Sequence, residues 1–95
     1  MNDYMNRVEQ QASAQGWHII GYTKERHSSG TVPSGVIAFV RAHPVFDDLR
    51  CGTARWADNG LGDTGIMFFN GHYDMSRDDA VEDFTKRTIG FTVGT

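Results

Sequence analysis

The stretch that decides the fold, residues 65–87, reads GIMFFNGHYDMSRDDAVEDFTKR. Its first part, residues 65–73, is rich in apolar and aromatic side chains, which favours a β-strand. Ser76 follows, and Asp79 stands three residues later, an acidic variant of the capping box that begins a helix. A strand that leads directly into a capped helix indicates a fold of the α+β class.

The rest of the chain supplies a first helix and further strands. Apolar residues from Tyr4 to Ala12 recur at spacings of three and four, which predicts a helix with one buried face that ends at Gly16. Strands are expected at residues 17–25, 35–42, 52–57 and 65–73, with a last edge strand at 88–93. Together these elements predict one α+β domain over residues 1–95. It has a four- to five-stranded, mostly antiparallel sheet with an N-terminal and a C-terminal helix packed on one face.

Charge is unevenly distributed along the 95 residues, whose net charge is −3. Residues 47–95 carry nine acidic and five basic side chains, a net charge of −4, whereas residues 1–46 carry +1. Direct nucleic-acid binding needs a basic stripe, and none is visible, so a basic protein surface is the expected partner. There is no membrane-spanning run, no signal-peptide pattern and only one cysteine, so we expect a cytoplasmic protein.

The densest group of carboxylates lies on and just before the second predicted helix. Its members are Asp74, Asp78, Asp79, Glu82 and Asp83. Helix-end charge explains Asp78 and Asp79, but Glu82 and Asp83 lie further into the helix, where carboxylates four residues apart repel one another. Two interpretations stay open: a solvated helix face, or a docking surface for an Arg/Lys-rich protein.

Two aromatic residues, Trp56 and Tyr73, are expected to be partly exposed. Aromatic side chains of this kind can anchor a protein interface, although packing at the edge of the core explains them equally well. An edge strand of the sheet could also pair with a second copy of the chain and form a homodimer.

Two patterns suggest chemistry and have simpler interpretations. Residues 60–65 match G-x-G-x-x-G, but a β-type run follows where a dinucleotide site needs a helix, so we interpret them as a hairpin loop. Cys51 lies next to Arg50, which would favour a reactive thiolate, but a lone cysteine at a strand start is more often a half-buried packing residue.

A metal site is the stronger catalytic hypothesis. His72 and Asp74 stand two residues apart on a strand and therefore share a face. Asp47 or Asp48 could join them in a metal-dependent hydrolase or nuclease. Zinc-type spacing is absent from the sequence, so we expect no resident metal or other cofactor and keep the enzyme as the alternative.

In length, in its α+β layout and in the acidic segment DDAVEDF at residues 78–84, the chain resembles small anti-CRISPR inhibitors, which phages and plasmids use against host defences. The resemblance covers the whole chain in general character and rests on no motif. It implies a non-catalytic protein-binding inhibitor whose acidic helix face occludes an Arg/Lys-rich, nucleic-acid-binding surface of a defence complex such as a CRISPR–Cas effector.

Overall fold

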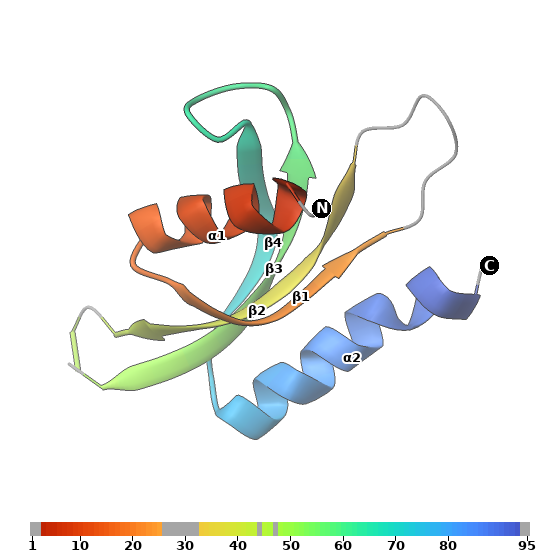
Figure 1. Cartoon of the computed structure of the whole chain (residues 1–95). Coiled ribbons are helices and arrows are strands. Elements are labelled where there is room, and N and C mark those ends of the chain that lie inside the picture. The colour runs from red at the N-terminus through yellow and green to blue at the C-terminus, as the bar shows by residue number, and fades with distance from the viewer. Residues whose placement is uncertain (1–2, 26–32, 44, 47, 94–95) are drawn as a thin grey trace.

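The secondary structure follows the order helix, four strands, helix in the residues that the computed structural model describes, which are 3–25, 33–43, 45–46 and 48–93. The elements are α1 (Asp3–Ala14), β1 (His18–Lys24), β2 (Ser34–Ala42), β3 (Leu49–Asp58), β4 (Ile66–Met75) and α2 (Arg77–Val93). The described strands form an antiparallel sheet in the order β1-β2-β3-β4, with β1 and β4 at its edges (Figure 1). The predicted α+β class, a four-stranded antiparallel sheet with both terminal helices packed against it, is confirmed.

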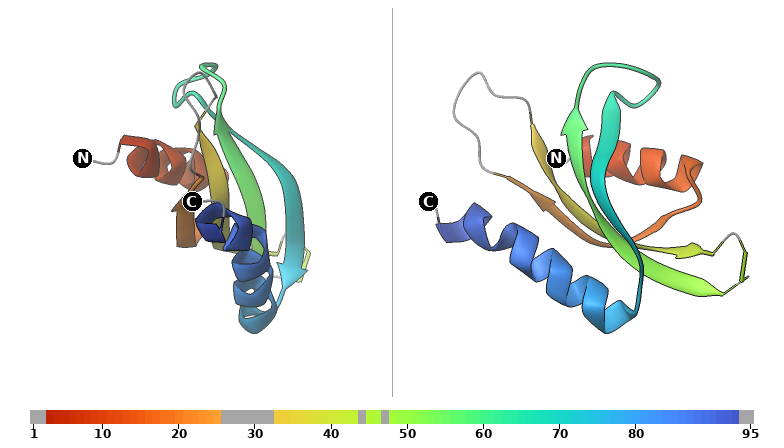
Figure 2. Two further views of the ribbon diagram at one scale, coloured as in Figure 1. Left: turned by 90° about the vertical axis from the view of Figure 1, so that its right-hand side faces the viewer. Right: turned by 180° about the vertical axis from the view of Figure 1, so that it is seen from behind.

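The two helices lie on opposite faces of the sheet, which passes between them in Figures 1 and 2. Ile37 of β2 belongs to the buried cluster that contains Val8 of α1. Its neighbour Ala38 points the other way and pairs with Gly21, where an added methyl group would lie 3.3 Å from the Phe84 ring of α2. The expectation of one shared face is therefore corrected. The nearly continuous apolar run of β2 is the pattern of a strand covered on both faces.

Trp56 lies in the core on the α1 side and is fully buried. Its indole Nε1 donates a hydrogen bond to the Thr23 carbonyl oxygen at 2.9 Å. Its ring stacks against those of Tyr4 and Tyr22, each at a centroid distance of 5.8 Å. The prediction of a partly exposed Trp56 is wrong because these rings and α1 remove it from solvent.

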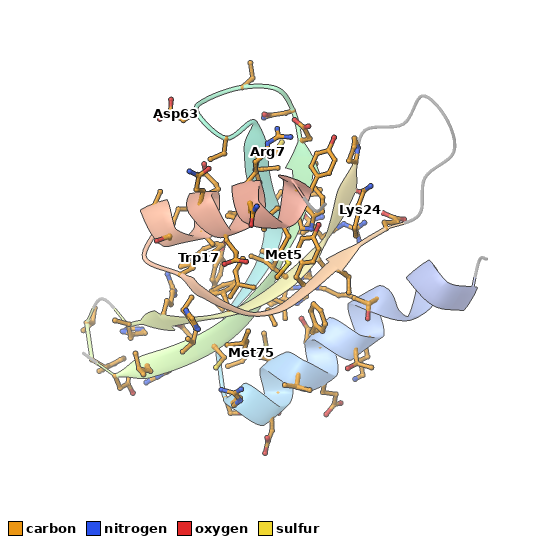
Figure 3. All side chains as sticks on the ribbon, in the orientation of Figure 1. Met5, Arg7, Trp17, Lys24, Asp63 and Met75 are labelled. Carbon is orange, nitrogen blue, oxygen red and sulfur yellow. The ribbon has the colours of Figure 1, made fainter. Side chains whose placement is uncertain are left out.

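Gly16 stops α1 just after its last helical residue, Ala14, as predicted. Gly16 has a φ of 79°, its amide donates to the Ser13 carbonyl at 3.0 Å, and the Trp17 amide donates to the Ala12 carbonyl at 2.8 Å. These two bonds form a Schellman motif. The turn folds Trp17 back beneath α1 (Figure 3), where its ring stacks on Phe39 at a centroid distance of 4.0 Å.

The segment between β3 and β4 is a hairpin loop, as predicted. Gly60, Gly62 and Gly65 have φ values of 73°, 72° and 74°, which glycine adopts without steric cost. Arg7 of α1 pairs with Asp58 at the start of the loop, at 3.2 Å, and so ties the hairpin to the helix (Figure 3). Since β4 follows the glycines, the loop has no helix N-terminus on which to hold a phosphate.

α2 begins where the sequence predicts, because the Ser76 hydroxyl oxygen accepts a hydrogen bond from the Asp79 amide at 3.1 Å. The helix runs through residues 88–93, so the predicted edge strand there is wrong. The hydroxyls of Thr85 and Thr88 donate to backbone carbonyls about one turn earlier, so these β-branched residues are accommodated in a helix. Neither of the helices that the structure describes is long and apolar enough to cross a membrane.

Both edge strands contain a break in register. In β4, Asn70 and Asp74 have φ values of 51° and 60°, and the pairing with β3 shifts at two corresponding points. In β1, the pairing with β2 shifts between Ile19 and Gly21. Asn and Asp tolerate the left-handed conformation better than most residues, and each bulge bends its strand and increases the local twist.

Candidate functional site

Three carboxylates near the start of α2 face solvent: Asp78, Asp79 and Glu82, here called the acidic face. Asp78 and Asp79 lie in the first turn, where the helix dipole stabilises negative charge. Within the described part of the chain, no basic side chain lies within ion-pair distance of either. Glu82 pairs with Lys86 one turn later at 3.1 Å, and both side chains are well exposed, so solvent weakens this pair.

A shallow hollow of about 260 Å³ lies beside the acidic face and is lined by Met75, Asp79, Glu82, Asp83 and Lys86. Figure 3 shows Met75 between the end of β4 and the first turns of α2. The hollow thus combines carboxylates with the apolar thioether side chain of a methionine. Such a surface suits a long basic side chain, whose alkyl stem packs on apolar atoms while its charged head meets carboxylates.

Asp83 also lines the hollow, but its carboxylate is hydrogen-bonded to side chains of the sheet. It accepts hydrogen bonds from the Thr53 hydroxyl of β3 and from Nδ1 of His72 on β4, the latter at 2.8 Å. Arg87 of α2 lies 3.4 Å away through its Nε. Burial alone would raise the pKa of Asp83, but the hydrogen bonds from Thr53 and His72 and the nearby positive charge outweigh it and lower the pKa.

Arg87 completes this cluster, and its side chain is only 12% exposed. Its Nη2 donates to the Asn70 carbonyl oxygen at 2.6 Å and lies 2.7 Å from Nε2 of His72. Because a guanidinium can only donate, Nε2 is the acceptor and the proton of a neutral His72 sits on Nδ1, facing Asp83. Burial is the largest cause and lowers the pKa of Arg87. The negative charge of Asp83 opposes this effect, and the positive charge of Arg55 adds to it. The four side chains Thr53, His72, Asp83 and Arg87, here called the α2 clamp, fasten the helix to the sheet.

Asp74 is also engaged within the chain. It accepts a hydrogen bond from Arg41 at 3.3 Å and lies 3.8 Å from Nε2 of His43. Tyr73 is 46% exposed, as expected, but it lies on the α1 side of the sheet, with its ring 6.0 Å from that of Phe39 and the Arg41 guanidinium 4.9 Å away. Neither residue lines the hollow beside α2.

The residues of the metal hypothesis do not meet in the described part of the chain. Both ring nitrogens of His72 are occupied by Asp83 and Arg87, and Asp74 is held by Arg41. Asp48 pairs with Arg50 at 3.0 Å, and Asp47 lies outside the described residues. Among the residues with described positions, no three His, Cys, Asp or Glu side chains come together as metal ligands.

Cys51 is buried on the side of β3 that faces α2. With 7% of its surface exposed, it packs as a small apolar residue. The predicted interface residue Trp56 is fully buried and is not available to a partner. Of the residues predicted for partner binding, Asp78, Asp79 and Glu82 remain as an exposed group on one surface.

The internal role of Asp83 was not predicted from the sequence. The spacing of Asp83 and Arg87, four residues apart on a helix, was a usable signal for an ion pair. The contributions of Thr53 and His72 had no such signal, since they depend on how β3 and β4 pair. Comparisons with protein-family models, with curated proteins and with solved structures find no match to this chain.

Proposed function

We propose that this chain is a non-catalytic protein-binding inhibitor. Its acidic face, Asp78, Asp79 and Glu82, would occupy Arg or Lys side chains on the nucleic-acid-binding surface of a host defence complex, such as a CRISPR–Cas effector in the bacterial cytoplasm. The observation that carries the proposal is the exposure of these carboxylates beside a hollow that fits a long basic side chain.

The chemistry of the hollow supports this choice of partner. Asp79 and Glu82 line it together with Met75. An incoming arginine can form paired hydrogen bonds with a carboxylate and can compete with Lys86 for Glu82, because that pair is exposed and weak. Uncompensated negative charge also speeds the encounter with a basic surface, in a way that salt suppresses.

Blocking a nucleic-acid-binding surface requires no reaction. A surface that binds phosphates presents Arg and Lys in a groove, and carboxylates placed against those side chains exclude the phosphates that they would otherwise hold. This proposal agrees with a structural use of His72, Asp83 and Arg87, since the three side chains contact one another across the helix–sheet boundary.

The test compares two charge-neutralising double variants of the same size. Asp79→Asn/Glu82→Gln removes two carboxylates from the hollow, and Glu9→Gln/Asp63→Asn removes two exposed carboxylates from α1 and the β3–β4 loop. A protein captured by the wild type from a bacterial lysate is identified by mass spectrometry and purified. Its affinity for each variant is then measured by isothermal titration calorimetry at 50 and 300 mM NaCl.

We expect the hollow variant to bind at least about tenfold more weakly than the wild type, since it loses charge-assisted hydrogen bonds, and the control to bind normally. The wild type should also displace nucleic acid from the captured protein. Equal affinity of both variants at both salt concentrations, or a captured protein that keeps its nucleic acid, would refute the proposal.

A further inference from the structure

The loop that joins β2 and β3 exposes a group of large apolar side chains. Val45, Phe46 and Leu49, here called the hairpin tip, are 76%, 65% and 73% exposed. Among the side chains whose exposure the structure describes, they are three of the four most exposed large apolar ones. The fourth, Leu61, is 71% exposed and lies in the β3–β4 loop at the other end of the molecule (Figure 1). Single exposed apolar residues are ordinary, whereas several that come from one loop can mark a contact surface.

Local interactions hold Val45 and Phe46 of the hairpin tip in place without burying them. Nδ1 of His43 accepts hydrogen bonds from the amides of Val45 and Phe46, at 3.0 and 3.1 Å. The His43 ring packs on Phe46 at a centroid distance of 4.7 Å. The Arg50 guanidinium lies 5.5 Å from the centre of the same ring and is itself held by Asp48 at 3.0 Å. An aromatic side chain ordered before contact loses less conformational entropy when a partner covers it.

The hairpin tip lies at the same end of the molecule as the start of α2, in each of the views in Figures 1 and 2. Side-chain contacts connect the two regions: His43, which packs on Phe46, lies 3.8 Å from Asp74. Asp74 directly precedes Met75 of the hollow, and Ser76 then caps α2. The exposed apolar group and the start of α2, which carries the acidic face, therefore lie at one end of the protein.

We propose that the hairpin tip is the apolar anchor of the partner interface, with Phe46 and Leu49 inserted into an apolar pocket of a protein whose rim is basic. This inference rests on the proposed function and specifies the partner: its Arg or Lys side chains flank an apolar pocket. The arrangement is that of specific interfaces, in which a buried aromatic anchor is surrounded by polar and charged contacts.

The negative charge at this end of the chain favours a basic protein as the partner over a lipid bilayer or a second copy of the chain. A bilayer with anionic lipids would repel the uncompensated carboxylates at this end of the chain. A symmetric second copy would bring the same patch of both chains together and so oppose two acidic faces. A basic protein surface is complementary to the carboxylates and can offer a pocket to the apolar residues.

The test places a photo-crosslinking residue at the proposed contact. Phe46→p-benzoylphenylalanine is compared with Leu61→p-benzoylphenylalanine in a bacterial lysate, each alone and with Asp79→Asn/Glu82→Gln. In parallel, Phe46→Ser/Leu49→Ser and the control Leu61→Ser are titrated with the purified protein that the wild type captures. Both sites are exposed, so thermal unfolding of all variants should match the wild type and confirm their folding.

We expect a cross-linked adduct from position 46 with the same protein that the acidic face binds, absent from position 61 and lost when the acidic face is neutralised. Loss of Phe46 and Leu49 should weaken binding about 30-fold or more, the effect of removing interface anchors, whereas Leu61→Ser should bind normally.

Several outcomes would overturn the inference. An adduct of the chain with itself would identify a second copy as the occupant. Co-sedimentation of the wild type, but not of Phe46→Ser/Leu49→Ser, with phosphatidylcholine–phosphatidylglycerol vesicles would identify a membrane. A third outcome separates the two proposals. If Asp79→Asn/Glu82→Gln loses binding but Phe46→Ser/Leu49→Ser binds normally, the hairpin tip is not the anchor and the proposed function still stands. Normal binding of Asp79→Asn/Glu82→Gln would reject the proposed function and, with it, the basic rim.

Discussion

Replacing Asp83 with asparagine tests whether the α2 clamp holds the helix to the sheet. The substitution keeps the shape of the side chain and removes its charge. Asp83 is the common partner of Thr53, His72 and Arg87. The amide retains one oxygen acceptor, so it can satisfy only part of this set.

The expected cost follows from the contacts that are lost. Hydrogen bonds to a charged group contribute about 1.5–3 kcal/mol each. Asp83 is 25% exposed, so solvent screens part of this effect, and asparagine recovers another part. Arg87, at 12% exposure, is left without its counter-charge. We therefore expect the free energy of unfolding to fall by about 2 kcal/mol, which for a domain of this size lowers Tm by about 8–16 °C.

The assay is urea unfolding followed by tryptophan fluorescence and by far-ultraviolet circular dichroism at pH 7. The matched control is Glu82→Gln, which makes the same chemical change on the adjacent residue. Glu82 forms an exposed pair with Lys86, so its loss should cost about 0.5 kcal/mol or less. If Asp83→Asn unfolds within about 0.5 kcal/mol of Glu82→Gln, the clamp does not contribute to stability and the reasoning fails.

Three further results are expected. The pKa of Asp83 is lowered below its ordinary value of 3.8, so its contribution to stability is present above that pH and is lost as the pH falls further. When the free energy of unfolding is measured at decreasing pH, Asp83→Asn should therefore lose less stability than the wild type. Identical losses would contradict the assignment. Tyr22→Phe should leave urea stability unchanged or raise it slightly, because the buried hydroxyl has no hydrogen-bond partner in the described structure, and a loss above about 1 kcal/mol would reveal a missed contact. Gly35→Ala should prevent folding or strongly destabilise the chain, since its methyl group would lie 1.9 Å from the Thr23 carbonyl oxygen; Gly62→Ala, with open space around it and a φ of 72°, should cost only about 1 kcal/mol by the same assay, and equal effects would disprove the steric argument.

The parts of the fold set by local sequence were predictable. The Ser76 cap, the Gly16 stop and the glycine-rich hairpin loop each depend on residues within a few positions of one another. The segment at 88–93 was not predictable in this way, because its β-branched and aromatic residues favour a strand locally and are overridden as the helix extends. The nearly continuous apolar sequence of β2 already indicated that both faces of the sheet are covered.

The candidate site was predictable as a segment and less so residue by residue. Sequence spacing locates carboxylates on α2, and three of them are exposed. It cannot show that Asp83 is hydrogen-bonded to the sheet, because its partners Thr53 and His72 come from two strands brought together only by pairing. Trp56 of β3 is likewise buried by Tyr4 of α1 and Tyr22 of β1. These residues are far apart in the sequence, so no local pattern predicts the contact.

The bulges at Asn70, at Asp74 and between Ile19 and Gly21 have a consequence for behaviour at high concentration. A β-sheet with two open edges is a template on which further molecules can stack into fibrils. Here a foreign strand laid along either edge would lose its hydrogen-bond spacing after a few residues. The same irregularities that curve the sheet thus oppose fibril growth from its ends, and a homodimer formed through an edge strand would have to accommodate them.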